Sequence, residues 1–144
     1  MTIEQHVEDE IKCYLENSSP QHAFLVPFVE RYHVLPLLVD WNGFFGLRSN
    51  GDIVLVMYED GTKGMEPVEE ARIRRIAISQ GARKYGWVSE LIPPRSRDAV
   101  DCPHCSGTGQ IEIEGKVIDG VICYCGGLGW LEPQELTEME IGSA

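Results

Sequence analysis

Long apolar runs and catalytic signatures are both missing from this chain of 144 residues. No apolar stretch approaches the roughly 20 residues that are needed to cross a bilayer. Residues 1–10 are polar and acidic, unlike a signal or transit peptide. We therefore expect a soluble, cytoplasmic protein that has no membrane partner.

The chain also lacks the common catalytic motifs. It contains no Gly-x-Ser-x-Gly, no His-Glu-x-x-His and no Gly-x-x-x-x-Gly-Lys. Acidic residues such as Asp40, Asp52 and Asp60 lie in segments that resemble turns, where Asp is favoured because its side chain bonds to the nearby backbone. The sequence therefore predicts no catalytic residue, and we expect the protein not to be an enzyme.

Positive charge is scarce as well. Lys and Arg number 12 against 23 Asp and Glu, so the formal net charge is −11. An acidic surface repels phosphate backbones, which makes nucleic acid an unfavourable partner. The only basic run comprises Arg72, Arg74, Arg75, Arg83, Lys84, Arg95 and Arg97. Because glutamates accompany it, we interpret this run as a solvated, salt-bridged helix face.

Cysteine is the most informative residue type in the chain. Four of the five cysteines form a C-x2-C pair, Cys102 and Cys105, and a C-x-C pair, Cys123 and Cys125, separated by 17 residues. An odd count in a cytosolic chain does not suit a disulfide framework. Two close thiol pairs suit a tetrahedral ion instead, with zinc favoured and iron as the competitor. The isolated Cys13, on an N-terminal helix, is expected to be a small core residue.

The residues between the two pairs resemble a β-hairpin. Residues 110–114 alternate in polarity, 115–116 can turn, and 117–122 can return, which would fold the pairs together. Glycines follow each pair and allow backbone N–H groups to point at sulfur. With four thiolates no coordination position is left for water, so the zinc would be structural.

A thiol-redox role is the alternative interpretation of the same cysteines, since Cys-x-x-Cys is also a redox arrangement. Nothing around Cys102 resembles the strand-to-helix setting of such sites. His104 could compete as a ligand, but ligation by neighbouring residues 104 and 105 is awkward. We expect His104 to be exposed.

The segment Cys102-Pro-His-Cys-Ser-Gly-Thr-Gly109 resembles the C-x-x-C-x-G-x-G repeat of the DnaJ-type zinc domain. Cys125-Gly-Gly-Leu-Gly-Trp130 resembles a second repeat, although the family would place a Cys at Ile122 and this chain has Cys123. Two repeats suffice for one metal, and the His-Pro-Asp of a J domain is absent. The resemblance implies a metal-binding scaffold, with a chaperone-type or thiol-redox module as the alternative.

The remaining sequence predicts an α+β fold with an antiparallel sheet, packed helices and a small zinc-bound hairpin at its end. Thr2 and Gln5 can form a capping box for a first helix, and residues 20–33 are expected to form a short one. Residues 35–41 are apolar and lead into a turn at 42–43, and strands are expected over 44–47 and 53–58. A further helix is expected from Pro67 to about Gln80, with Val68, Ala71 and Ile76 facing the sheet.

Leu35-Pro-Leu-Leu, Trp41-Asn-Gly-Phe-Phe-Gly-Leu47 and Asn50-Gly-Asp52 together resemble the SUKH superfamily of bacterial immunity and scaffold domains. The usual second Gly after Asn-Gly is Phe44 here. The resemblance covers roughly residues 20–95 and implies protein binding, because its immunity members block a toxin by occupying its surface.

These observations divide the chain into an α+β domain (1–97), a zinc-binding hairpin module (98–132) and an acidic tail (133–144). The leading hypothesis is a non-enzymatic, zinc-stabilised protein that binds another protein, with a cationic toxin as the partner that charge and the SUKH resemblance suggest. A nucleic-acid-binding zinc protein is the third hypothesis. The sequence gives no indication of oligomeric state.

Overall fold

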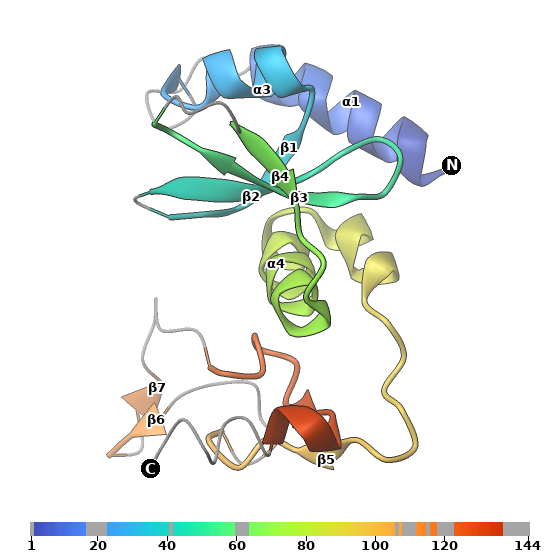
Figure 1. Cartoon of the computed structure of the whole chain (residues 1–144), viewed down its shortest axis with the longest axis vertical. Coiled ribbons are helices and arrows are strands. Elements are labelled where there is room, and N and C mark those ends of the chain that lie inside the picture. Colours follow the sequence, from blue (N-terminus) through green and yellow to red (C-terminus); the bar gives the residue numbers. More distant parts are fainter. Residues whose placement is uncertain are drawn as a thin grey trace.

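The computed structural model of the chain describes residues 2–16, 23–40, 42–59, 64–105, 107, 112–114, 116–117 and 123–136. Its elements lie in layers (Figure 1). Helices α1 (Ile3–Glu16) and α3 (Val26–Tyr32) cover one face of a sheet, and α4 (Ala71–Lys84) covers the other. The C-terminal segment, which carries the four clustered cysteines, lies beyond α4. None of the helices in this described part has both the length and the apolar character needed to cross a membrane.

The sheet is antiparallel and follows chain order. It consists of β1 (Leu35–Val39), β2 (Gly43–Leu47), β3 (Ile53–Met57) and β4 (Met65–Pro67). The pair β2–β3 runs in register from Gly43 opposite Met57 to Leu47 opposite Ile53. The apolar pattern of the sequence predicted β2 and β3, whereas the residues of β1 were expected only as an apolar segment before a turn. The α+β class is confirmed. β1 is an outer strand, a position that becomes important below.

Helix α1 begins with the predicted capping box. The backbone N–H of Gln5 donates to Thr2 Oγ1 at 3.2 Å, and that of Thr2 donates to Gln5 Oε1 at 2.9 Å. Its buried stripe consists of Val7, Ile11 and Tyr14. Cys13 was expected in the core, but it is exposed. Two residues after Ile11, it lies on the opposite side of the helix from the stripe.

The basic helix differs from its predicted position at both ends. Residues 65–67 form β4 instead, with Pro67 opposite Val54 of β3, and α4 then runs from Ala71 to Lys84. A proline is tolerated there because β4 is an outer strand. The buried apolar residues of α4 are Ala77, Ile78 and Gly81. Val68 is partly buried and packs against the core, as expected. The sheet-facing prediction was wrong for Ala71, which is exposed, and for Ile76, which lies against Gly126 of the cysteine loop.

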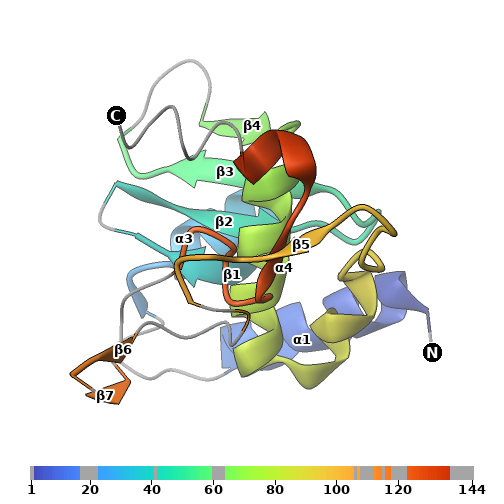
Figure 2. The ribbon, with the colours of Figure 1, turned by 90° about the horizontal axis from the view of Figure 1, so that it is seen from below.

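A 3-10 helix, η1 (Gly86–Leu91), follows α4 and packs against it. The chain then returns through irregular, mostly exposed residues to β5 (Val100–Asp101), which pairs with β8 (Trp130–Leu131). In Figure 2, which is seen from below, this C-terminal segment crosses in front of α4. Of the predicted hairpin, β6 (Glu112–Ile113) pairs with β7 (Lys116–Val117), and apart from Glu114 the rest of 110–122 lies outside the described residues. Residues 133–136 form one helical turn, and 137–144 also lie outside.

Candidate metal centre

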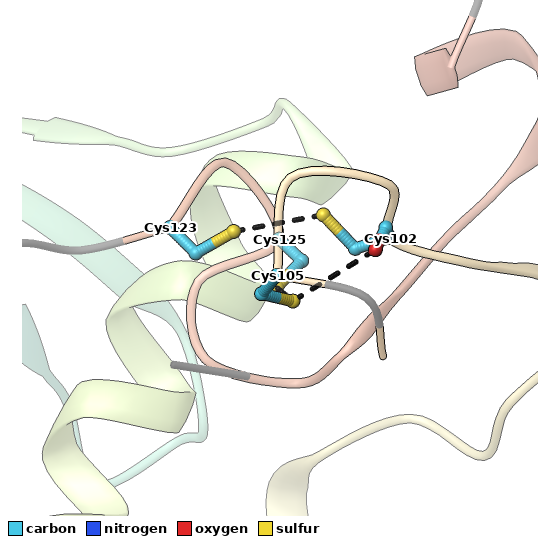
Figure 3. Close-up of side chains that lie close together, drawn as sticks. All are labelled: Cys102, Cys105, Cys123 and Cys125. Carbon is cyan, nitrogen blue, oxygen red and sulfur yellow. Dashed lines mark hydrogen bonds between the residues drawn. The ribbon is translucent and has the colours of Figure 1, made fainter. Parts of the chain in front are cut away.

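Two short loops bring the four clustered cysteines together. Cys102 and Cys105 follow β5, and Cys123 and Cys125 precede β8, so the pairing of these two strands places the loops side by side. All four side chains are buried, with exposures between 0% and 6%. Their Sγ atoms lie within 4.8 Å of one another, and they face a common centre (Figure 3). The structure thus assembles the four cysteines that the spacing singled out.

The distances between the sulfurs suit a shared ion. Cys102 Sγ lies 3.5 Å from Cys123 Sγ, and Cys105 Sγ lies 3.7 Å from Cys125 Sγ. These values are far longer than a disulfide bond of about 2.05 Å, and all four cysteines are free thiols. Tetrahedral zinc with Zn–S bonds of about 2.3 Å would separate its sulfurs by about 3.8 Å. The donor set therefore fits a soft, tetrahedral cation.

Glycines with positive φ shape the second loop. Gly126, Gly127 and Gly129 have φ values of 75°, 93° and 87°, a region that costs other residues energy. The N–H of Gly126 donates to Cys123 O at 2.7 Å, which closes a tight turn. The N–H of Gly129 donates to Cys125 Sγ at 3.2 Å, which confirms the expectation that glycines aim a backbone donor at sulfur.

Burial disfavours the charged form of the thiols in this loop, so thiolates here depend on a nearby positive charge. Burial raises the pKa of the Cys123 thiol above its ordinary value. Burial also raises the pKa of Cys125, although the N–H groups of Gly129 and Gly127 oppose this by stabilising its thiolate. A bound divalent ion would supply the charge that keeps buried thiolates deprotonated.

The same loop packs directly on α4. Gln80 Nε2 donates to Gly126 O at 3.0 Å, and Arg72 Nη1 donates to Tyr124 O at 3.2 Å. The Arg72 guanidinium also lies 4.1 Å from the centroid of the Tyr124 ring. Tyr124 is the residue between the two cysteines of the C-x-C pair. Four thiolates around one divalent cation would carry two net negative charges, which this guanidinium would help to offset.

A second arginine of α4 holds the end of the described chain. Arg75 forms a buried ion pair with Glu135 and lies 4.9 Å from the Trp130 ring centroid. Glu135 also accepts from the N–H of Glu132 at 2.8 Å, which caps the last helical turn. The prediction that the basic run is a solvated helix face was therefore wrong for Arg75, which is buried, and for Arg72, which is partly buried. Arg74 and Arg83 are exposed, as expected.

Sequence reasoning identified the four cysteines and expected His104 to be exposed, which the structure confirms. It missed Arg72, Arg75, Gln80 and Glu135, which join the cysteine loop and the last turn to α4. The sequence signal for this docking was the cluster of arginines on one helix, which had been interpreted as a solvated face.

Comparison of the chain with protein-family models, with curated proteins and with solved structures gives no match. The resemblances to the DnaJ-type zinc repeat and to the SUKH superfamily therefore remain predictions.

Proposed function

We propose that this is a non-enzymatic protein in which Cys102, Cys105, Cys123 and Cys125 bind one structural zinc ion. The observation that carries the proposal is the cluster of four buried sulfurs within 4.8 Å of one another. Iron could use the same four thiolates, and zinc is favoured because its structural sites combine thiolates in this tetrahedral way. All four positions would be filled by protein, so no site for an activated water would remain.

The ion would stabilise the C-terminal module as a docked unit. It would join the loop after β5 to the loop before β8, and the second loop already contacts α4 through Gly126 and Tyr124. Structural zinc contributes on the order of 10–16 kcal/mol in small finger peptides. That is enough to hold a module which has a cysteine-rich interior and few large apolar side chains.

We further propose that the protein acts by binding another protein of basic character, as a SUKH-like immunity factor would bind a cationic toxin. The net charge of −11 supports a cationic partner. Phe24, Val39 and Met57 supply exposed apolar side chains of the kind found in interface cores. A reducing compartment such as the cytoplasm fits the five free thiols.

The two other hypotheses have less support. A redox pair needs an accessible thiolate, and the four clustered thiols are at most 6% exposed. A nucleic-acid site on α4 would need its arginines to be free, and Arg72 and Arg75 contact the C-terminal module.

Elemental analysis of protein purified without a metal-affinity step tests the metal proposal. We expect one zinc per chain in the wild type and in Cys13→Ser, and loss of zinc in Cys102→Ser and Cys123→Ser. Thiol titration of the wild type should detect only Cys13 until a chelator is added. No stoichiometric metal, or a mass that shows the clustered thiols joined in pairs, would overturn the proposal.

The partner proposal is tested separately, by isolating the tagged protein from its native cells at low ionic strength. We expect one basic protein at a defined ratio, released by salt and lost in the Phe24→Ser variant but retained in Lys116→Met. A nucleic acid in place of a protein, or no partner at all, would contradict it.

A further inference from the structure

A cavity of about 340 Å³ lies beside the outer strand β1, between the two helical layers. Its apolar walls are Leu25 and Phe24, which precede α3, and Pro36 and Val39 of β1. Phe24 and Val39 remain 60% and 43% exposed, so the cavity opens to solvent between apolar side chains. The volume is at the small end of the range of roughly 300–1,000 Å³ that is typical of small-molecule sites.

A positively charged side chain also lines this largely apolar cavity. Lys84, at the end of α4, lines the cavity. Within the described part of the chain, no carboxylate forms an ion pair with it. The Lys84 side chain is still exposed to solvent, and partial desolvation against the protein lowers the pKa of Lys84. An anion bound at this position would pair with the ammonium and oppose that shift.

Two tyrosines complete the lining. Tyr14 comes from the end of α1, and Tyr85 directly follows Lys84. Burial raises the pKa of both phenols to about 12, so both are neutral hydroxyls at physiological pH. The neutral hydroxyl of Tyr85 can donate a hydrogen bond to a bound oxygen.

We propose that this cavity binds a carboxylate attached to an aromatic or branched apolar group, with the carboxylate on Lys84 and the apolar group against Phe24 and Val39. A single lysine matches the single charge of a carboxylate. A phosphate, with more charge, would be opposed by the acidic chain around it and would meet a single cation among the described lining residues. The apolar walls make a bare inorganic anion a poorer match than an acid with an apolar body.

The carboxylate could belong to a free acid or to the C-terminal residue of a peptide. The proposal does not depend on zinc, because none of the clustered cysteines lines the cavity. Its failure and the failure of the metal proposal are therefore distinguishable.

Titration of the zinc-loaded or as-purified full chain with three probes tests the proposal, by NMR shifts or calorimetry. The probes are 3-phenylpropionate as the free acid, N-acetyl-phenylalanine as the peptide end, and 3-phenylpropionamide as the neutral analogue. We expect saturable binding of at least one acid, at least tenfold weaker binding of the amide, and shifts at Tyr14, Phe24, Val39 and Tyr85. If both acids bind, a free acid is sufficient as the ligand. If only N-acetyl-phenylalanine binds, the ligand is the C-terminal end of a peptide.

Two lysine variants test whether Lys84 supplies the positive charge that binds the carboxylate. Lys84→Met should weaken binding of the acid at least tenfold and leave the amide unchanged, whereas Lys116→Met, which removes an exposed lysine of β7, should leave both unchanged. Equal binding of acid and amide, shifts at other residues, or no binding by any probe would overturn the proposal. If Lys84→Met does not fold, the acid–amide comparison and the shift map on the wild type still decide.

Discussion

Arg75 of α4 and Glu135 of the last helical turn form an ion pair that is buried on both sides, with side-chain exposures of 7% and 6%. The two residues are 60 positions apart in the sequence. Their contact joins the end of the C-terminal module to the helix that covers the sheet. The module is therefore held at two places, by this ion pair and by the contacts of the cysteine loop with Arg72 and Gln80.

Removing one partner of this pair should be costly. Glu135→Gln leaves the buried guanidinium without its counter-charge, and we expect the free energy of unfolding in urea to fall by about 3 kcal/mol. Glu90→Gln, which removes an exposed carboxylate from η1, should change it by less than about 0.5 kcal/mol. The double variant Arg75→Met/Glu135→Leu should recover much of the loss, because neither buried charge remains. Equal effects of Glu135→Gln and Glu90→Gln would show that the pair does not hold the module.

The cysteine loop should tolerate no side chain at Gly126. A Cβ there would lie 2.6 Å from Ile76 Cγ1 and 2.8 Å from the Ile76 Cα, on the backbone of α4, in addition to the strain of φ 75°. Gly51 has a φ of 92°, and no heavy atom lies within 4 Å of the position that its Cβ would take, so Gly51→Ala isolates the strain. We expect Gly51→Ala to cost about 1 kcal/mol and Gly126→Ala to cost more and to weaken zinc binding.

Urea unfolding measures the stability of the Gly51→Ala and Gly126→Ala variants, and competition with a zinc chelator measures their affinity for zinc. Gly86→Ala, which has neither a positive φ nor a close neighbour, serves as the neutral control. The account of loop docking is wrong if Gly126→Ala is no more destabilising than Gly51→Ala.

Acid should remove the contact between α1 and the end of α3. The ring of His33 hydrogen bonds to both carboxylate oxygens of Glu8, at 2.8 and 2.7 Å, and this lowers the pKa of Glu8 below its ordinary value of 4.5. A lowered folded-state pKa stabilises the fold above pH 4.5, and the contribution is lost as the pH falls through the folded-state pKa. The stability difference between wild type and Glu8→Gln should therefore shrink between pH 7 and about pH 3.

Urea unfolding at several pH values follows this difference, with Glu4→Gln as a control on the same helix. Subtracting each variant from the wild type cancels the acid release of any bound metal. A difference for Glu8→Gln that stays constant across the range would exclude the linkage.

Local features of the sequence predicted much of the fold. The capping box of Thr2 and Gln5, the apolar runs of β2 and β3 and the cysteine spacing each depend on neighbours in the chain, and each appears in the structure. The start of α4 was wrong because Pro67 is common both at the first turn of a helix and in an outer strand. Pairing with Val54 decided between the two, and that contact is tertiary.

The docking of the C-terminal module could not be predicted in the same way. Arg72 and Arg75 have glutamates as near neighbours in sequence, which favoured a solvated face, yet their contacts in the structure are Tyr124 and Glu135. The exposure of Cys13 could not be predicted for a similar reason, because it depends on which stripe of α1 faces the core.

X-ray absorption at the zinc edge of the purified full chain tests the central claim most directly. We predict one zinc per chain with four sulfur neighbours at about 2.3 Å and no nitrogen or oxygen bound to it. The Cys13→Ser variant should give the same spectrum. A protein without stoichiometric zinc, or zinc with fewer than four sulfur ligands, would contradict the account.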